Sequence, residues 1–413
     1  MIITHPVHGS VEFNDLLTSL INTPEINRLK RINQLGMVSL VFPGGTHSRF
    51  LHAIGVCFLA GKIADHLGLP KEEKDTIQAA ALLHDVGHGP FSHMLDILRP
   101  RSKDHEVIAK DIILGRYTMS IPGSGKIPSI FKKYNIDSTA VAKLINGEYK
   151  EKPYLQQIIN GPVDADKLDY LLTDSHFTGA KIGVIDTDRI ISVMVLEDNH
   201  LKFLEKGKPI IKAIRSARRN MLAEVYIHHT ARITEKMMLK AVELSGIKEF
   251  YDFDDSMLIS LLLTSESEKA RDLVARILYN CNPLNPKNNY LQRNLYKVAF
   301  QIPSTSMTKK KLNILKKLRK IGNSRIEKAL SKRSGLEKGD ILVDFPEIYP
   351  IYSDSDFSRL KIEFKKDKKG KTNYSCFSVY CARENLIEVN KTVKELVKKA
   401  SQINLNSSWI NRF

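Results

Sequence analysis

The sequence has few cysteines and no long apolar run, and both absences exclude classes of protein. Its 413 residues include four cysteines, and none of them forms a CxxC pair. Scattered cysteines in a chain of this size argue against a disulfide framework and are typical of buried thiols in a reducing compartment. No apolar run approaches the ~20 residues that span a bilayer, and the N-terminus lacks a basic-then-apolar signal pattern. We therefore expect a cytoplasmic protein with no membrane partner.

Acidic residues are outnumbered by basic ones. Lys and Arg total 63 against 46 Asp and Glu, which gives a formal net charge of +17. Such an excess attracts polyanions such as nucleotides, nucleic acid or acidic lipid surfaces, although it does not specify a fold. The sequence shows no internal repeat, and 413 residues suffice for one large core and a smaller lobe.

One short stretch, Leu82–His93 (LLHDVGHGPFSH), concentrates groups that a hydrophobic core does not need. An adjacent His and Asp end an apolar helical run, and a Gly-Pro turn and two more histidines follow. Buried imidazoles and carboxylates cost free energy unless they are paired or bind a metal. The stretch therefore indicates a metal site with acid/base groups beside it.

Apolar periodicity predicts helices along most of the chain. Residues 1–20 predict a strand-turn-strand entry, and residues 23–36 predict a helix that begins at Thr23-Pro24 and that Gly36 ends. Two buried helices are predicted next, one from Thr46 onward and one from Pro70 into His84-Asp85. The pattern predicts a mainly α protein.

Two later segments also carry polar groups on predicted helices. In residues 163–174 (VDADKLDYLLTD), Asp166, Tyr170 and Asp174 are spaced four apart, so a helix places them on one face. A helix predicted over residues 210–238 is rich in basic side chains.

The character of the chain changes near residue 285, where Asn, Lys and Pro increase. We predict a helical core over residues 1–284 and a smaller C-terminal α/β lobe over residues 285–413. The segments ILVDFPEI, RLKIEF and SCFSVY show strand-type alternation. The basic stretch 308–332 is either a solvated helical face or a patch for nucleic acid or polyphosphate. It has no interleaved aromatic residue, so it does not indicate a base-stacking platform.

Four residues form a plausible metal set: His52, His84, Asp85 and Asp166. Each is a residue at the edge of a predicted helix, in the order H…HD…D along the chain. Two nitrogen and two oxygen ligands suit a divalent ion such as Mg, Mn, Fe, Ni or Zn and leave room for water. A hydrolytic ion needs such an open position, because it lowers the pKa of bound water and polarises a phosphoryl oxygen.

Further residues are candidates for acid/base chemistry and for phosphate contacts. Histidine titrates near neutrality, so His88, His93 and His105 are candidate proton donors, and Asp96 could hold an imidazole protonated. Arginine and lysine bind phosphate oxygens. The candidates for phosphate contacts are Arg49, Lys167, Tyr170 and Arg218.

With these residues in place, the chain resembles the HD-domain phosphohydrolases, and among them the deoxynucleoside triphosphate triphosphohydrolases. The likeness is greatest to the HD core of the sterile-alpha-motif/HD-domain enzymes; it starts at residue 1, and we expect no sterile-alpha-motif domain. It rests on HPVHGSVEF, NTPEINRLKRINQLG, FPGGTHSRFLHAIGV, LLHDVGHGPFSHMLD, His105-Glu106, VDADKLDYLLTD and RRNMLAEVYIHH, over about the first 240 residues.

The resemblance implies hydrolysis of a dNTP between the α-phosphate and the 5′ oxygen, with metal ligation by the four residues named above. It implies that Arg49, His88, His93 and His105 surround the α-phosphate, with His93 as proton donor and Asp96 as its partner. Lys167, Tyr170 and Arg218 would hold the outer phosphates, Gln34 and Asp174 the sugar 3′-hydroxyl. Tyr226 would lie under the sugar and His228 near the base. A homo-oligomer is also implied.

The chain departs from the animal enzymes at the position that helps to read an activating guanine nucleotide, where an Asp is replaced by Asn22. Asn27 and Lys30 also differ from the family pattern, so guanine-specific activation is in doubt, while activation by another nucleotide stays open. Two rival hypotheses are kept. One is an HD phosphatase or phosphodiesterase acting on another nucleotide or on nucleic acid, and the other is a non-catalytic nucleotide- or nucleic-acid-binding protein.

Overall fold

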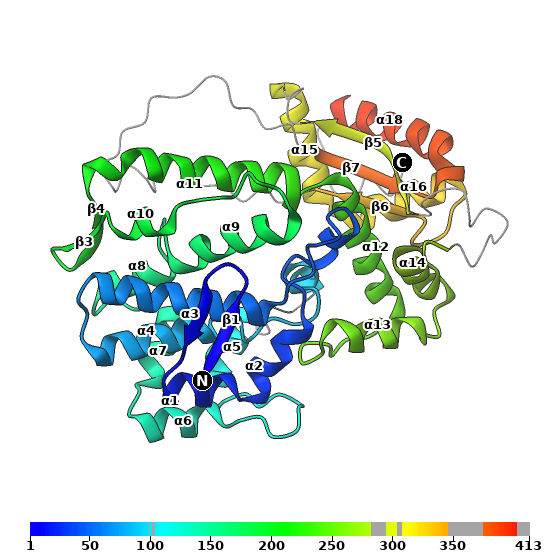
Figure 1. Cartoon of the computed structure of the whole chain (residues 1–413). Coiled ribbons are helices and arrows are strands. Elements are labelled where there is room, and N and C mark those ends of the chain that lie inside the picture. Colours follow the sequence, from blue (N-terminus) through cyan, green and yellow to red (C-terminus); the bar gives the residue numbers. More distant parts are fainter. Residues whose placement is uncertain (99, 101–103, 282–294, 304–307, 346–374, 403–413) are drawn as a thin grey trace. The chain divides into compact units, whose positions relative to one another are not determined.

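A computed structural model of the chain describes residues 1–98, 100, 104–281, 295–303, 308–345 and 375–402. Helices dominate this part of the chain, which confirms the mainly α fold (Figure 1). The chain forms two compact units. The described residues of the first lie within Met1–Val225 and Glu249–Leu258, and those of the second lie within Tyr226–Lys248 and from Ile259 onward. The predicted boundary at residues 284/285 lies outside the described residues and stays a prediction.

The first unit is built of helices with two short antiparallel hairpins, β1–β2 and β3–β4. Its elements in chain order are β1 (Ile2–His5), β2 (Gly9–Glu12), α1 (Asp15–Ile21), α2 (Pro24–Arg28), α3 (Arg49–His66), α4 (Lys71–Leu83), α5 (His105–Ile113), α6 (Ile127–Tyr134), α7 (Ser138–Ile145), α8 (Pro153–Ile159), α9 (Ala165–Thr178), α10 (Thr187–Ile191), β3 (Met194–Glu197), β4 (His200–Phe203) and α11 (Lys208–Met221).

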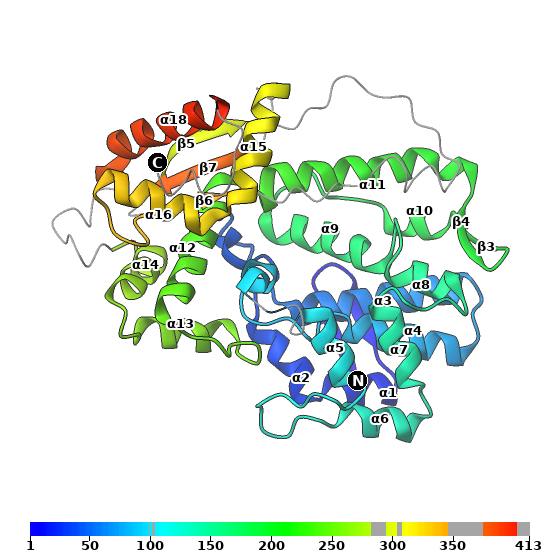
Figure 2. The same cartoon turned by 180° about the vertical axis from the view of Figure 1, so that it is seen from behind.

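Helix α3 is the centre of this unit. Its N-cap residue Ser48 accepts a hydrogen bond from the Leu51 N–H, which satisfies one of the donors that a helix start leaves open. Most α3 side chains are buried, because α4 and α9 pack against it from different sides. The reverse view shows α5 and α7 near α4 (Figure 2). The two predicted buried helices thus form the framework of the site.

The predicted helix over residues 23–36 is wrong in its length. Helix α2 ends at Arg28, a 3-10 turn follows over Leu29–Arg31, and Ile32 is extended. The apolar residues Ile26, Leu29 and Ile32 are fully buried. Ile26 lies in α2, Leu29 in the 3-10 turn and Ile32 in the extended segment, so the same apolar spacing is buried without α2 continuing.

The second unit contains the C-terminal α/β part. Its described elements are α12 (His229–Ser245), the end of α13 (Asp255–Leu263), α14 (Glu268–Tyr279), β5 (Lys297–Pro303), α15 (Lys309–Ile321), α16 (Asn323–Ser334), β6 (Ile341–Asp344), β7 (Ser375–Cys381) and α18 (Leu386–Gln402). The strands form an antiparallel sheet in the order β5-β7-β6, and buried side chains of α15, α16 and α18 share one apolar core with it.

The structure tests several C-terminal predictions. The predicted strands in ILVDFPEI and SCFSVY correspond to β6 and β7, whereas RLKIEF lies outside the described residues. The helix predicted over residues 210–238 is interrupted, because α11 passes into a π-helical turn at Leu222–Tyr226 before α12 begins. Within the described ranges, no helix combines the length and the apolar character that crossing a membrane requires.

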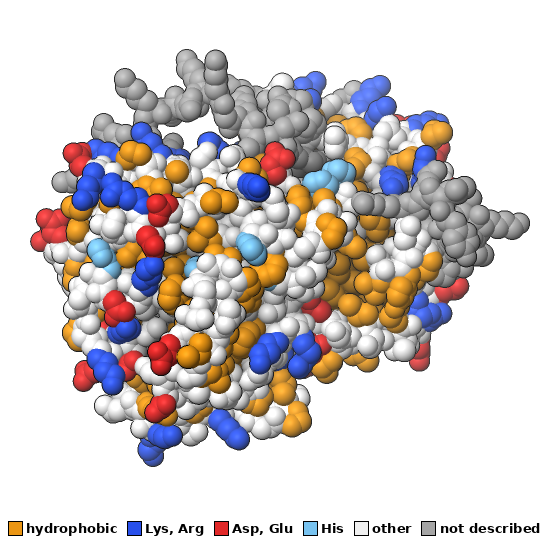
Figure 3. Space-filling model, viewed as in Figure 1, with side chains coloured by type: hydrophobic (Ala, Val, Ile, Leu, Met, Phe, Trp, Pro, Cys, Tyr) orange, Lys and Arg blue, Asp and Glu red, His pale blue; other side chains and the backbone are white. Residues whose placement is uncertain are grey.

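The excess of positive charge is not gathered into one patch on the face of the first unit that Figure 3 shows. Basic and acidic side chains are interspersed there (Figure 3). The basic residues 308–332 form α15 and most of α16, in the second unit.

Candidate metal and catalytic site

Two neighbouring helices bring His52 and the His84-Asp85 pair together. His52 lies one turn inside α3, and His84 follows the last residue of α4. Their rings meet edge to face, with centroids 5.2 Å apart. His84 Nδ1 lies 2.8 Å from the Ala81 carbonyl oxygen, so it is the donor there and its Nε2 lone pair is left for a ligand. His52, His84 and Asp85 each offer one ligand atom, all within 4.8 Å of one another.

Helix α9 adds Asp166 to this group. Its Oδ1 lies 3.0 Å from His52 Nε2 and 3.8 Å from His84 Nε2. Asp164 caps the start of α9 by accepting the Lys167 N–H at 2.8 Å, which fixes the turn that carries Asp166. Asp166 Oδ1 therefore lies within 3.8 Å of both imidazole nitrogens, next to the tighter group of His52, His84 and Asp85. The donor set and its spacing fit a divalent cation.

The charges around this point favour ionised carboxylates. Burial opposes ionisation of Asp85, but the Arg49 guanidinium and the nearby histidines hold its pKa well below the usual range. Burial likewise opposes ionisation of Asp166, and hydrogen bonding to His52 holds its pKa low. For His52, burial disfavours the charged form, yet the hydrogen bonds to Asp166 and Asp169 raise its pKa well above normal. Both carboxylates are thus in the state that ligates a cation.

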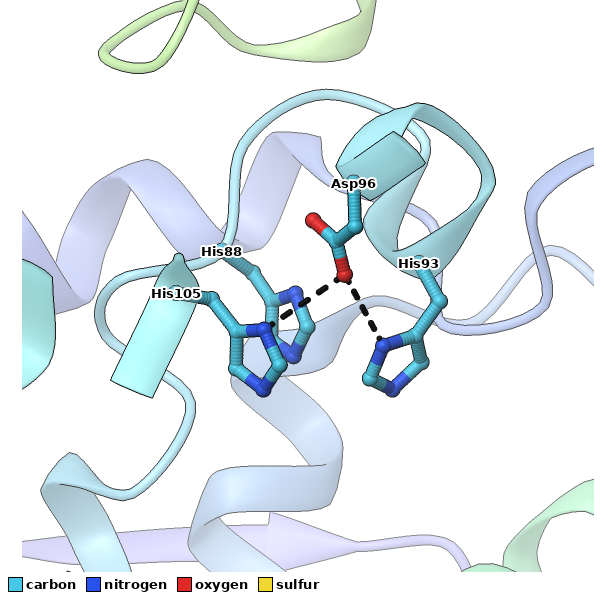
Figure 4. A group of neighbouring side chains, drawn as sticks. All are labelled: His88, His93, Asp96 and His105. Carbon is cyan, nitrogen blue, oxygen red and sulfur yellow. Dashed lines mark hydrogen bonds and ion pairs between the residues drawn. The ribbon is translucent and has the colours of Figure 1, made fainter. Parts of the chain in front are cut away.

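A second group lies beside the first and contains His88, His93, Asp96 and His105 (Figure 4). His88 and His105 stack with centroids 4.0 Å apart, and His93 meets both edge to face. Asp96 Oδ2 lies 3.1 Å from His93 Nδ1 and 3.4 Å from His105 Nδ1. A Cβ on Gly87 would overlap the His105 backbone, so glycine permits this close approach.

The three histidines differ in exposure and therefore in chemistry. The His88 side chain is 1% exposed, and burial together with the Arg49 charge lowers its pKa well below normal. The His93 side chain is 69% exposed and keeps its contact with Asp96. Burial opposes ionisation of Asp96, but hydrogen bonds from His105 and His93 hold its pKa low. His93 is therefore the exposed member of the group, with an ionised carboxylate beside it.

The loop before His93 is strained and held in place. Phe91 and Ser92 have φ values of 55° and 57°, in the left-handed region, which costs about 1–3 kcal/mol per non-glycine residue. The Phe91 N–H donates to Asp255 Oδ1 at 2.7 Å, and Arg49 Nε donates to Ser92 Oγ at 2.5 Å. Arg49 also pairs with Asp85. Arg49 thus connects the metal group to the histidine loop.

The predicted substrate residues of the first unit lie on α9, α11 and the loop before α3. Lys167 Nζ donates to Asp164 Oδ2 at 2.5 Å, and the Arg218 guanidinium lies 6.0 Å from the Tyr170 ring centre. Asp174 and Gln34 both contact His47, Asp174 through its side chain at 2.9 Å and Gln34 through a backbone hydrogen bond at 2.9 Å. Sequence reasoning brought forward Gln34 and Asp174 but missed His47.

Two predicted substrate residues, Tyr226 and His228, belong to the second unit. His228 caps α12, since its side chain accepts the Thr230 N–H at 3.3 Å. Their roles toward the site of the first unit stay predictions.

The structure also shows groups that the sequence reasoning missed. Asp169 lies behind His52, with Oδ2 2.7 Å from His52 Nδ1, and it is fully buried. Burial opposes its ionisation, but the hydrogen bonds with His52 and His8 lower its pKa to about 2. The sequence held a signal for both groups. Asp169 lies about one helical turn after Asp166 on the same predicted helix, and the chain begins with a segment, HPVH, that contains two histidines.

Family models match both parts of the chain. A family model described as an HD domain matches residues 49–173, and one described as an HD-associated region matches residues 185–359. His52, His84, Asp85 and Asp166 fall inside the first match.

Relatives and solved structures extend the likeness over most of the chain. An uncharacterised protein of Methanocaldococcus jannaschii is 32% identical over 71% of this chain, which spans 63% of that relative's length. A Dictyostelium discoideum protein, named a deoxynucleoside triphosphate triphosphohydrolase SAMHD1 homolog, is 28% identical over 86% of this chain and 69% of its own length. A crystal structure of a hypothetical protein from Aquifex aeolicus matches with a TM-score of 0.70 at 22% identity, over 95% of this chain and 99% of that one. That match shows a shared fold.

Proposed function

The chain belongs to the HD-domain phosphohydrolase family, and on that premise we propose that it hydrolyses dNTPs to deoxynucleoside and inorganic triphosphate. One observation carries the proposal. His52, His84, Asp85 and Asp166 converge beside a histidine cluster whose most exposed member, His93, is held by a carboxylate. A phosphohydrolase needs both a cation to neutralise phosphate charge and a proton donor for the leaving oxygen. The likeness to the Dictyostelium discoideum deoxynucleoside triphosphate triphosphohydrolase homolog supports dNTPs as substrates.

His52, His84, Asp85 and Asp166 would hold the divalent ion. When bound, the ion supplies Lewis-acid polarisation of a phosphoryl oxygen and a lowered pKa for water. Asp169 fixes the tautomer of His52, because its carboxylate accepts the Nδ1 proton at 2.7 Å and leaves Nε2 as the ligand atom. The Ala81 carbonyl does the same for His84.

His93 is the proposed proton donor to the departing 5′ oxygen. Asp96 Oδ2 accepts from its Nδ1 at 3.1 Å and orients the ring, and the proton to be transferred would be a second one, carried on Nε2 of the charged imidazole. Stacking against His105 places His88 next to it, and the lowered pKa of His88 makes that ring a neutral partner rather than an acid.

One set of residues, mostly basic, would bind the phosphates of the substrate, and other polar residues would bind its sugar and base. Arg49 presents a guanidinium at the α-phosphate while it anchors Asp85 and the Ser92 loop. Lys167, Tyr170 and Arg218 would bind the outer phosphates, and Tyr170 and Arg218 already lie face to face. Gln34 and Asp174 would bind the sugar 3′-hydroxyl, since both meet at His47. Tyr226 and His228 would contact sugar and base.

Other parts of the proposal rest on the family likeness. Asn27 Oδ1 accepts a hydrogen bond from Lys30 Nζ at 2.7 Å, so two residues that depart from the guanine-activated pattern bond to each other. This supports a protein without guanine-specific activation. A homo-oligomer, a cytoplasmic location, activation by another nucleotide, and nucleic acid binding through the basic α15–α16 region belong to the same set of proposals.

The test is a product analysis with matched variants. Purified protein is incubated with each dNTP and each rNTP, singly and mixed, with Mg²⁺ or Mn²⁺, and products are separated by ion exchange. We expect deoxynucleoside and triphosphate, with no turnover by Asp85→Asn. The control is Asp65→Asn, at the exposed carboxylate of Asp65 near the end of α3 that pairs with Lys74.

Other outcomes would change the proposed function in different ways. Monophosphate or diphosphate products would replace the proposal by another phosphohydrolase. Turnover only in mixtures would show an activating nucleotide. No turnover, with nucleic acid binding that survives Asp85→Asn and falls steeply with salt, would indicate a binding protein.

A further inference from the structure

Asp169 occupies a position that the proposed metal chemistry uses only indirectly. Its Oδ2 lies 2.7 Å from His52 Nδ1, on the side of the ring away from Asp166, whose Oδ1 lies 3.0 Å from Nε2. A metal-ligating histidine usually donates its other N–H to a carboxylate, which fixes the ring and makes it a stronger ligand. Asp169 is therefore an outer partner of the proposed metal centre. The residues that hold Asp169 in place can then affect metal binding.

The space around Asp169 is shaped for a carboxylate. Gly55 lies three residues after His52 on α3, and a Cβ there would overlap the Asp169 carboxylate. Thr173, one turn later on α9, donates its hydroxyl to Asp169 Oδ1 at 3.3 Å. The Asp169 side chain has no solvent exposure. Without water, every remaining lone pair of this carboxylate needs a protein donor.

That donor comes from the first hairpin of the chain, 161 residues away. His8 Nε2 lies 2.7 Å from Asp169 Oδ1, and its side chain is 5% exposed. His5 shapes the turn, because its Nδ1 accepts the backbone N–H groups of Val7 and His8, both at 3.2 Å. The His8 ring also lies against Phe58 of α3, with centroids 5.3 Å apart. The hairpin thus presents one imidazole N–H to one buried oxygen.

We propose that His8 is a positioning residue for the metal ligand His52, acting through Asp169. The inference rests on the proposed metal centre. Each Asp169 oxygen faces one histidine, so loss of the His8 hydrogen bond leaves Oδ1 with the longer 3.3 Å bond from Thr173, and the carboxylate then holds the ring of His52 less firmly. The β1–β2 hairpin is then part of the metal site rather than a cover over the core.

The experiment measures Mn²⁺ affinity of the metal-stripped full chain by calorimetry, and needs no substrate. His8→Ala should weaken the Mn²⁺ Kd by about 10–100-fold, the range for outer partners of metal ligands. His8→Gln, which keeps an N–H near the position of Nε2, should recover part of the loss. On an Asp169→Asn background, His8→Ala should add no further loss, because the route through Asp169 is already broken.

The matched control is Val11→Ala, which removes buried methyl groups from strand β2 of the same hairpin. It should lower the melting temperature and leave the Mn²⁺ Kd unchanged. Equal losses of affinity in His8→Ala and Val11→Ala would overturn the inference, as would an unchanged Kd in a folded His8→Ala protein. A wild-type chain that binds no Mn²⁺ would overturn the metal centre and the inference together. Products other than triphosphate with intact Mn²⁺ binding would overturn only the proposed reaction.

Discussion

The two units differ in the partners of their buried ionisable groups. In the second unit every buried carboxylate described faces cations: Asp344 Oδ1 lies 2.7 Å from Arg232 Nη2 and 3.2 Å from Lys236 Nζ. Lys240 is likewise shared by Glu243 and Glu327 at 2.6 and 2.7 Å. In the first unit, imidazole nitrogens of His52 and His84 lie 3.0 to 3.8 Å from carboxylate oxygens of Asp85 and Asp166, and Asp85 also pairs with Arg49.

This difference separates structural charge from functional charge. Opposite charges that compensate each other leave nothing for a ligand, and removing one of them destabilises the fold. Imidazole and carboxylate ligand atoms that gather in one buried place are typical of binding and catalytic sites. The comparison therefore predicts that the first group controls chemistry and the second controls stability, and each experiment below tests one side.

The largest effect is expected from Asp85→Asn. The substitution removes a ligand charge and the partner of Arg49, so turnover should fall to background and Mn²⁺ binding should be lost. Calorimetry and a turnover assay measure both. Retained Mn²⁺ binding would place the ion elsewhere, while Asp65→Asn should behave as wild type.

His93→Gln should lower kcat by about 10²–10⁴-fold, the usual contribution of a general acid. The Mn²⁺ Kd should stay unchanged, because His93 pairs with Asp96, which does not belong to the proposed ligand set. Steady-state kinetics and calorimetry on the same preparation separate the two. A lost Mn²⁺ site in this variant would contradict the division of the first unit into a metal group and an acid/base group.

Asp344→Ala tests the second unit. Removing one member of a buried ion pair leaves charges uncompensated, which costs about 3–5 kcal/mol of unfolding free energy. Urea unfolding measures it, and the Mn²⁺ Kd should stay unchanged, because the partners of Asp344 named above all belong to the second unit. Asp188→Asn, at an exposed carboxylate, serves as the control.

Asp255 gives a pH-dependent effect of smaller size. Burial raises its pKa to about 6, above the ordinary 3.8, while it accepts the Asn33 and Phe91 N–H groups. The folded state thus holds the proton more tightly, so this stabilising contribution is complete below about pH 4 and is lost as pH rises through about 6.

Wild-type unfolding free energy should therefore fall relative to Asp255→Asn across that window, by at most about 3 kcal/mol for two pKa units. Urea unfolding of both proteins from pH 4 to pH 8 measures the difference. A constant difference over the whole range would contradict a raised pKa. The effect is expected because burial outweighs the Asn33 and Phe91 N–H groups, which by themselves would lower the pKa of Asp255.

The sequence predicted those parts of the site that depend on local order. LLHDVGHGPFSH places the end of an apolar helix, two metal-ligand candidates and two acid/base candidates within one short segment, and the spacing of Asp166 and Tyr170 follows from helix geometry alone. Residues on one helical turn have fixed relations, so their placement is readable from sequence.

Contacts between distant segments were not readable. Asp169 meets His8 across 161 residues, and Phe91 meets Asp255 across 164. The sequence around a single carboxylate on an amphipathic helix does not indicate which distant residue that carboxylate contacts. The same holds for the ion pairs of Asp344. The 3-10 turn after α2 was missed for another reason: apolar spacing alone does not distinguish the period of an α-helix from that of a 3-10 helix.

The most direct test of the account is the fate of oxygen-18 from labelled water during dNTP hydrolysis with Mn²⁺, followed by mass spectrometry of the products. We predict one labelled oxygen in inorganic triphosphate and none in the deoxynucleoside, as attack on the α-phosphorus requires. Label in a mononucleotide or in orthophosphate would contradict a triphosphohydrolase built on His52, His84, Asp85, Asp166 and His93.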